Sequence, residues 1–343
     1  MKNNNYILVT GAAGFIGAAL SKKLLENGNN VIGIDNLNKY YDLKLKKDRL
    51  RDLKLLSNKI KGEWIFKKID LVDRKRIFRL FKKYQPKIVI NLAAQAGVRY
   101  SLINPNSYIQ SNILGFSNVI EASAEIKVEN FIYASSSSVY GLNQKIPFDE
   151  DHKVDHPVSL YAATKRSNEL IAHSFSNIYA LPATGLRFFT VYGPWGRPDM
   201  APMIFTKAIM EGQSINVFNY GEMLRDFTYI DDVVNCIYLC CDKPATKNND
   251  FDLLNPKSSS SFAPHRIFNI GNSNPIELKR FIQLLEDEIG KKALKKYLPM
   301  QKGDVISTSA YMENIKDWVG FEPKINIKKG IENFVAWYKK YYY

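Results

Sequence analysis

The chain has 343 residues, a length that suits one large domain or two closely joined domains. Hydrophobic residues make up 45% and charged residues 24%, which is ordinary for a globular protein and excludes an intrinsically disordered or fibrous chain. The formal net charge of +14 at pH 7 would suit a nucleic acid, an anionic membrane surface or an acidic small substrate, and it does not choose among them.

The beginning of the chain is predicted to form a strand, a helix and a second strand. Short apolar runs predict strands at 6–9 and 31–34, and apolar residues recur with helical spacing from Phe15 to Leu25. A glycine-rich turn, Gly11 to Gly17, separates the first strand from the helix. Because this turn interrupts the apolar residues almost at once, no signal peptide is expected in the start MKNNNYILVTG.

Strands and helices continue to alternate as far as Arg187. A basic segment from Asp42 to Lys61 has leucines at helical spacing and predicts an amphipathic surface helix, with nucleic-acid binding as the less favoured reading. Further strands are predicted at 64–69, 87–91, 130–134 and 183–187, and further helices at 74–84, 107–124 and 161–178. This alternation predicts an α/β fold with a Rossmann-type, doubly wound parallel sheet covered on both faces. The longest apolar run, around 87–97, is too short to cross a bilayer, so we expect a soluble, cytoplasmic protein.

Beyond Arg187 the strict alternation ends, and we expect a smaller α/β substrate-binding domain. TVYGPWGRPDM predicts an ordered loop, and the polar stretch Thr246 to His265 predicts a mobile surface loop. Cys236, Cys240 and Cys241 gather in one apolar, helix-like stretch, which favours buried reduced thiols. The predicted division assigns 1–187, with about 227–245 and 266–291, to a cofactor-binding domain, and 188–226, 246–265 and 292–343 to the substrate-binding domain.

The glycine-rich turn TGAAGFIG indicates a dinucleotide site. Gly11, Gly14 and Gly17 follow a strand and open a helix, so backbone N–H groups and the helix N-terminus can approach a pyrophosphate. Asp35 ends the second strand, where a carboxylate can accept hydrogen bonds from the adenosine ribose hydroxyls and would repel a 2′-phosphate. The predicted cofactor is therefore NAD rather than NADP.

A second pattern combines a tyrosine, a lysine and a serine cluster. Tyr161 and Lys165 in YAATK stand four residues apart, on one face of a predicted helix. An adjacent ammonium and a positive nicotinamide would lower the pKa of the phenol and make it a usable general base. The serines Ser135 to Ser138 fall at the carboxyl end of a predicted strand, where ligands bind in parallel sheets.

Together these motifs resemble the extended short-chain dehydrogenase/reductase superfamily, and in particular its nucleotide-sugar epimerases. The segments LAAQAGVRYS, YASSSSVYG, DHPVSLYAATK, GLRFFTVYGPWGRPDM, RDFTYIDD and LPMQKGD are similar to the UDP-glucuronate 4-epimerase family over nearly the whole chain. The resemblance implies a tightly bound NAD, regenerated in each cycle, a 4-keto intermediate, and a product that commonly feeds surface polysaccharides. It also implies a homodimer formed by two helices of each subunit, with 107–124 and 161–178 as candidates.

The resemblance assigns roles to individual residues. The implied catalytic group is Ser136, Tyr161 and Lys165, and the implied cofactor-binding residues, with Tyr161 and Lys165 again among them, are Gly11, Gly14, Phe15, Ile16, Gly17, Asp35, Asn36, Asp70, Leu71, Ala93, Ala94, Gln95, Asn112 and Phe188. The implied substrate-binding residues are Arg99, Ser136, Ser137, Thr190, Arg197, Arg225 and Asp304. A 4-keto uronate is a β-keto acid, which loses CO₂ unless its carboxylate is held out of alignment with the carbonyl, and Arg197 is expected to hold it.

Several alternatives stay open. A UDP-glucose or UDP-N-acetylglucosamine 4-epimerase would use the same cycle, and a UDP-glucuronate decarboxylase would share the intermediate. Ser137 and Ser138 stand where a 4,6-dehydratase would carry an acid pair, which argues against elimination. A non-catalytic RNA-binding scaffold is the alternative from another class. No metal is expected, although DEDHKVDH gathers His152 and His156 amid acidic residues, because the segment is predicted to be a loop. No nucleic-acid or membrane partner is expected.

Overall fold

The computed structural model of the protein describes residues 5–301 and 304–343. Its centre is a seven-stranded, fully parallel sheet in the order β10-β6-β5-β4-β1-β2-β3. This order, which reverses beside β1, confirms the predicted doubly wound α/β fold. The strands are β1 (Tyr6–Thr10), β2 (Asn30–Asp35), β3 (Trp64–Lys68), β4 (Ile88–Asn91), β5 (Asn130–Ser136), β6 (Ala183–Phe188) and β10 (His265–Ile270).

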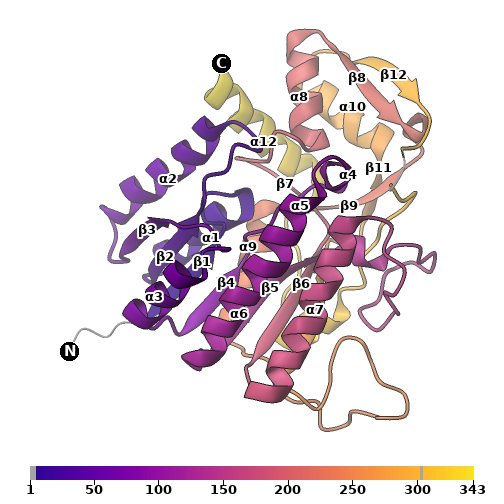
Figure 1. The fold of residues 1–343 in the computed structure, drawn as a ribbon. Helices are drawn as coiled ribbons and strands as arrows, with labels where there is room; N and C mark the ends of the chain where they lie inside the picture. Colours follow the sequence, from indigo (N-terminus) through magenta and orange to yellow (C-terminus); the bar gives the residue numbers. More distant parts are fainter. Residues whose placement is uncertain (1–4, 302–303) are drawn as a thin grey trace.

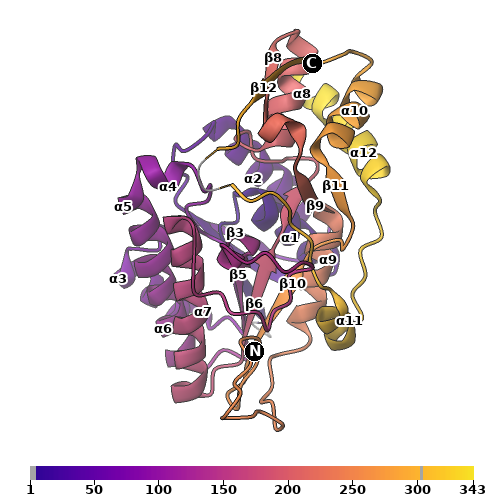
Figure 2. The same ribbon diagram turned by 90° about the vertical axis from the view of Figure 1, so that its right-hand side faces the viewer.

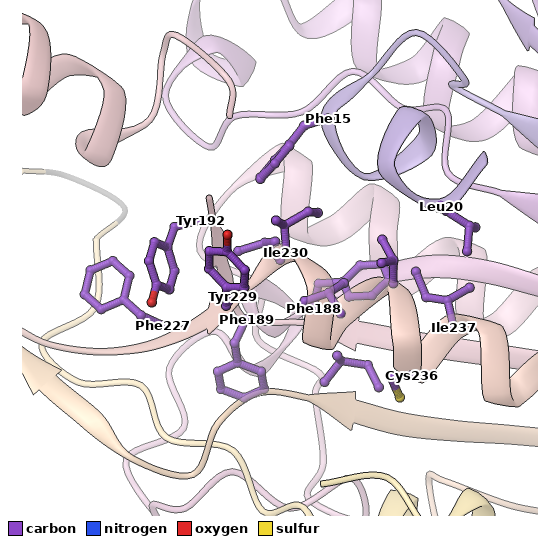
Figure 3. Close-up of a cluster of buried hydrophobic side chains, with 14 of the residues drawn as sticks. Phe15, Leu20, Phe188, Phe189, Tyr192, Phe227, Tyr229, Ile230, Cys236 and Ile237 are labelled. Carbon is purple, nitrogen blue, oxygen red and sulfur yellow. The ribbon is translucent and has the colours of Figure 1, made fainter. Parts of the chain in front are cut away.

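Helices cover both faces of this sheet, as Figure 1 shows. One layer contains α1 (Phe15–Glu26), α2 (Leu43–Ser57) and α9 (Ile230–Cys241), and the other contains α3 (Arg74–Tyr84), α6 (Gly115–Glu125) and α7 (Leu160–Tyr179). Successive side chains of a strand point to opposite faces, so Ile7 and Val9 join one buried cluster and Leu8 joins the other. Figure 3 shows Phe15 of α1, Phe188 of β6, and Ile230 and Cys236 of α9 gathered in the first cluster. All three cysteines are buried and free, which confirms the prediction for them.

Two small sheets and several helices form a second group of elements. The sheets have the orders β11-β9-β7 and β12-β8, and Figures 1 and 2 place β8 and β12 at one end of the molecule. The strands are β7 (Thr190–Tyr192), β8 (Ser214–Phe218), β9 (Leu224–Tyr229), β11 (Pro275–Glu277) and β12 (Leu294–Leu298), and the helices are α8 (Ala201–Glu211), α10 (Leu278–Ile289), α11 (Glu313–Val319) and α12 (Ile327–Tyr342). α10 packs against α8 and α12, whereas α11 packs against β10. The residues between α9 and β10 lie at the opposite end of the molecule from β8.

The predicted helix over 107–124 is helical throughout but changes type along the chain, from the end of α5 (Pro105–Tyr108) through a π-helical turn η1 (Ile109–Leu114) to α6. The short helix α4 (Tyr100–Ile103) precedes α5. Asn104 caps α5, which Pro105 begins, so a new helix starts at this point. The π-helical turn adds one residue to the local repeat and changes which side chains face the sheet, a feature that is frequent at functional sites.

The basic segment 42–61 also differs from its prediction. It forms α2 as expected, but α2 is not simply a surface helix, because Lys46, Asp48 and Arg49 are buried. Charged groups are buried only where partners compensate them, and these side chains contact residues far away in the sequence. Within 5–301 and 304–343, no helix is long and apolar enough to span a membrane, and no group of residues is arranged to hold a metal ion.

Candidate active site

The glycine-rich turn between β1 and α1 packs against the loop that follows β4. Gly11 has a φ of +69°, and a Cβ on it would lie 2.9 Å from the backbone of Ala93. A Cβ on Gly17 would lie 2.1 Å from the carbonyl oxygen of Gly11, so neither position tolerates a side chain. Gly14 caps α1 without a side-chain hydrogen bond, and the first turn of α1 has no acidic residue. The positive end of α1 is therefore available to an anion such as a pyrophosphate.

Two carboxylates line the same cleft near the ends of β2 and β3. Asp35 accepts hydrogen bonds from the backbone N–H of Leu37, at 2.7 Å, and of Ala13, at 3.3 Å. Asp70 accepts a hydrogen bond from the side chain of Asn36, at 2.9 Å. Both carboxylates are thus fixed by neighbours, in positions that suit the ribose and adenine of a dinucleotide.

Asn112, in η1, does not line the cleft, in contrast to the other predicted cofactor-binding residues. Its side-chain oxygen accepts from the N–H of Gln95, at 2.8 Å, and its amide donates to the carbonyl of Gln95, at 3.0 Å. Asn112 therefore fixes the loop after β4, which itself lines the cleft.

The predicted catalytic residues come together from the end of β5 and the start of α7. Ser159 caps α7 through a hydrogen bond from the N–H of Ala162, at 3.1 Å, which begins the helix just before Tyr161. The Lys165 ammonium donates to the carbonyl of Ala134, at 2.8 Å. Ser136, Tyr161 and Lys165 all line the cleft, and the Ser136 hydroxyl, which accepts from the N–H of Ser138 at 3.2 Å, favours the ionised form of the Tyr161 phenol.

The electrostatics of this group differ in one respect from the sequence-based expectation. Burial raises the pKa of Tyr161, while the hydrogen bond with Ser136 and the charge of Arg197 oppose the rise. Burial also lowers the pKa of Lys165 to about 8. In the chain by itself burial therefore outweighs the groups that lower the pKa of Tyr161, and a positive charge placed beside the phenol would favour its ionised form.

A buried network that the sequence analysis missed lies behind these residues. Glu169 and Arg187 are fully buried and form a two-point ion pair, with N–O distances of 2.8 and 3.0 Å. Glu169 also accepts a hydrogen bond from Ser135, at 2.6 Å. The network joins β5, β6 and α7 at the positions next to Ser136 and Lys165, and so fixes their relative placement.

The arginines expected on the substrate side line the other part of the cleft. Arg99 pairs with Asp304, at 3.2 Å, and Arg225 donates to the backbone carbonyls of Val305 and Ile306, at 2.6 and 3.0 Å. Arg197 pairs with Asp199, and both side chains line the cleft. The motif LPMQKGD includes Lys302 and Gly303, which lie outside the described residues.

The cleft has a volume of about 1050 Å³, enough for a dinucleotide and a second nucleotide together. Apart from Asn112, every predicted site residue lines it. Further residues line the cleft without having been predicted, among them Tyr40, Tyr41, Lys46, Tyr100 and Asp199. The aromatic pair that begins five positions after Asp35, and an acidic residue two positions after Arg197, are the signals that could have indicated Tyr40, Tyr41 and Asp199. His152 of the segment DEDHKVDH accepts a hydrogen bond at Nδ1 from the N–H of Asp149, at 3.3 Å, within its own loop.

The fold and the cleft define an α/β enzyme of the nucleotide-cofactor-binding class, with a serine, a tyrosine and a lysine at its centre. The model of the NAD dependent epimerase/dehydratase family matches residues 7–271, and the chain belongs to this family. The chain is 50% identical to Protein CapI of Staphylococcus aureus, over 98% of this chain and 99% of that protein. It is 42% identical to the probable UDP-glucuronate 4-epimerase of Rhizobium meliloti, over 98% of this chain and 97% of that protein.

A solved structure is also similar over its full length. It is the UDP-glucuronic acid 4-epimerase of Bacillus cereus in complex with UDP-glucuronic acid and NAD, with a TM-score of 0.86 and 32% identity. The match covers 98% of this chain and 100% of that chain.

Proposed function

We propose that the protein inverts C4 of UDP-glucuronate to give UDP-galacturonate, with NAD as a bound cofactor that is regenerated in each cycle. The observation that carries the proposal is one cleft that holds the Ser136, Tyr161 and Lys165 group and also presents Arg197 to it. The similarity to UDP-glucuronate 4-epimerases over nearly the whole chain supports the same substrate.

The chain is suited to hold NAD by the glycine-rich turn, Asp35 and Asp70, with Lys165 near the nicotinamide ribose. Bound there, NAD would supply a hydride acceptor for C4 of the sugar and the means to return the hydride to the opposite face. This redox step is needed because the C4 hydrogen has no neighbouring carbonyl that would stabilise a carbanion. The sugar turns over within the cleft between the two hydride transfers.

The proton is handled by Tyr161. As phenolate it takes the proton of the C4 hydroxyl in the forward step and gives a proton back when the hydride returns. Ser136, which lines the same cleft as the phenol, is assigned to hold the C4 oxygen. Burial raises the pKa of the phenol, so a positive charge added beside Tyr161 would help it to release the proton.

The negative groups of the substrate face arginines. A guanidinium presents paired donors that match a carboxylate or a diphosphate. We assign the uronate carboxylate to Arg197 and Thr190, and the diphosphate side to Arg225 and Arg99. Ser137 and Asp304 line the same part of the cleft and complete the proposed substrate contacts.

The test is to incubate the purified protein with UDP-glucuronate and to identify the products by chromatography and mass spectrometry. The proposal predicts UDP-galacturonate without added cofactor. Turnover of neutral UDP-sugars only would indicate a UDP-glucose or UDP-N-acetylglucosamine 4-epimerase. UDP-pentose with CO₂ as the main products would indicate a decarboxylase. Binding of RNA with no turnover would indicate a scaffold.

We further propose a homodimer in which α6 and α7 of two subunits form a four-helix bundle. Exposed apolar side chains on neighbouring elements, Ile109 and Leu114 of η1 and Leu170 of α7, support it. A cytoplasmic location and the lack of nucleic-acid and membrane partners stay predictions. The domain division also stays a prediction. It assigns α10 to the cofactor-binding domain, whereas α10 packs against α8 and α12 of the second group of elements.

A further inference from the structure

The loop that carries Arg197 is held by the segment after β2, which also lines the cleft. Arg197 pairs with Asp199 through two hydrogen bonds on one edge of its guanidinium, with Nε 3.1 Å from Oδ1 and Nη2 2.5 Å from Oδ2. Tyr40 donates a hydrogen bond from its hydroxyl to the same Oδ2, at 3.0 Å. The three side chains form a line, with Tyr40 fixing Asp199 and Asp199 fixing the guanidinium.

The position of Tyr40 is itself closely defined. Its ring packs against the ring of Tyr100, with 4.7 Å between the centroids. A Cβ on Gly97 would lie 2.9 Å from the Tyr40 hydroxyl and 3.7 Å from Nη2 of Arg197, so only glycine leaves space for this contact. Burial, and then the charge of Asp199, raises the pKa of Tyr40 to about 12. The hydroxyl is therefore a hydrogen-bond donor throughout the working pH range.

Asp199 is ionised in this arrangement. Its burial opposes ionisation, but the Arg197 guanidinium outweighs that effect and lowers the pKa of the carboxyl. The carboxylate occupies the Nε and Nη2 edge of the fork, so the remaining N–H groups of Arg197 are the ones left for a substrate. Arg197 can thus meet a substrate carboxylate from one direction only.

The backbone of the loop is fixed by the same segment. Arg49 of α2 is buried and donates from Nη1 to the carbonyl of Ala13, at 2.9 Å, within the glycine-rich turn. Its Nη2 donates to the carbonyls of Trp195, at 2.5 Å, and of Gly196, at 3.3 Å. One side chain thereby joins the turn proposed to bind NAD to the loop that carries Arg197.

We propose that Tyr40 and Asp199 are positioning residues, which orient Arg197 so that the substrate carboxylate stays out of alignment with the C4 carbonyl of the intermediate. Arg49 supports them by fixing the backbone of the loop. The inference rests on the proposed function, because it concerns the fate of the 4-keto uronate.

The competing reaction defines what must be prevented. A β-keto acid loses CO₂ when the C5–C6 bond lies parallel to the π orbitals of the C4 carbonyl. The bond then breaks, its electron pair forms the enolate of C4 and C5, and the enolate takes a proton at C5 from water. Return of the hydride to C4 gives a UDP-pentose, so no additional oxidant or reductant is consumed. A loosely held carboxylate reaches this alignment more often than a fixed one.

The test measures the ratio of UDP-pentose to UDP-galacturonate formed from UDP-glucuronate by the wild type, Tyr40→Phe and Asp199→Asn. Tyr40→Phe removes one hydroxyl and keeps the ring against Tyr100. Loss of a hydrogen bond to a charged group corresponds to about tenfold, so the ratio is expected to rise about tenfold in Tyr40→Phe and at least as much in Asp199→Asn. A role in folding alone would lower both products together and leave the ratio unchanged.

The matched control is Tyr6→Phe, because Tyr6 also donates to a carboxylate, that of Glu63, at 2.7 Å and far from the cleft. Its product ratio should equal that of the wild type. If Tyr40→Phe and Asp199→Asn both keep the wild-type ratio while they retain NAD and turn over, the inference is wrong. If the wild type makes no UDP-galacturonate, the proposed function fails, whatever the variants do.

Discussion

The Tyr161 hydroxyl is the single group on which the proposed chemistry depends most. We expect Tyr161→Phe to lower kcat by about 10²–10⁴-fold, because a positioned general acid or base contributes that much. NAD should stay bound, since Gly11, Asp35 and Asp70 are untouched. The measurements are the initial rate with UDP-glucuronate and the NAD content of the purified variant. An unchanged rate would exclude Tyr161 as the base.

Glu150 makes stability depend on pH. It is fully buried, and its carboxylate accepts hydrogen bonds from the N–H of Asn269 and the side chain of Asn314, both at 2.8 Å. Burial raises its pKa to about 7 despite these bonds. Between pH 4.5 and 7 the folded state therefore keeps a proton that the unfolded state has released, so the contribution of Glu150 to stability falls as the pH rises.

Glu150→Gln removes this dependence. The free energy of unfolding of the variant, relative to the wild type, should increase by about 3 kcal/mol from pH 4.5 to pH 7. Urea unfolding followed by circular dichroism across this range measures the difference. A difference that is constant with pH would show that Glu150 titrates alike in both states.

At the scale of single residues, the sequence could predict the reacting groups but not their partners. Tyr161 and Lys165 are found from a local spacing, and nearly all the predicted site residues do line one cleft. Glu169 and Arg187, or Tyr40 and Asp199, meet only through the fold, across gaps of 18 and 159 residues. Which of many charged side chains pair at such separations is decided by packing, and no local pattern records it.

At the scale of elements, the strands and most helices could be predicted within a few residues from apolar periodicity. Arg74 to Tyr84 is predicted and observed with the same bounds. The stretch 107–124 is helical as predicted, but the apolar pattern did not reveal that Ile109–Leu114 forms a π-helical turn. A change of backbone hydrogen bonding leaves the spacing of apolar residues almost intact, so periodicity alone does not detect it.

Asp226 of β9 joins several elements of the smaller part. Its buried carboxylate accepts hydrogen bonds from the N–H groups of Asn272, Ser273 and Ala310, at 2.7, 3.1 and 2.9 Å. Asp226→Ala would leave these donors unpaired and is expected to lower the free energy of unfolding by about 2–4 kcal/mol. Chemical denaturation measures the loss. The exposed Asp250→Ala is the control and should stay within about 0.5 kcal/mol of the wild type.

At the scale of the whole molecule, the proposed dimer depends on apolar side chains left exposed on η1 and α7. Leu170→Glu places a charge on α7 at a side chain that is 57% exposed in the single chain, and is expected to convert the dimer to a monomer. Sedimentation velocity measures the change. Leu254→Glu is the control, since Leu254 is more exposed but lies in the loop between α9 and β10. If Leu170→Glu sediments like the wild type, the proposed interface is wrong.

The whole-molecule topology follows from the alternation of strands and helices, because parallel strands need crossover helices. The arrangement of the two small sheets and their helices could not be predicted from this alternation, because these elements come from several separated stretches of the chain. The arginines that line the cleft and would face the proposed anionic ligands account for only a small part of the net charge of +14. Most of the excess is carried by lysines elsewhere on the chain.

In the proposed reaction, C4 is oxidised and then reduced by the return of the same hydride. UDP-glucuronate that carries deuterium at C4, incubated with the purified protein in ordinary water, distinguishes this course from exchange with solvent. We expect UDP-galacturonate that retains the deuterium at C4, as seen by mass spectrometry and NMR. UDP-galacturonate with hydrogen at C4 would contradict it, because inversion would then proceed by exchange with water.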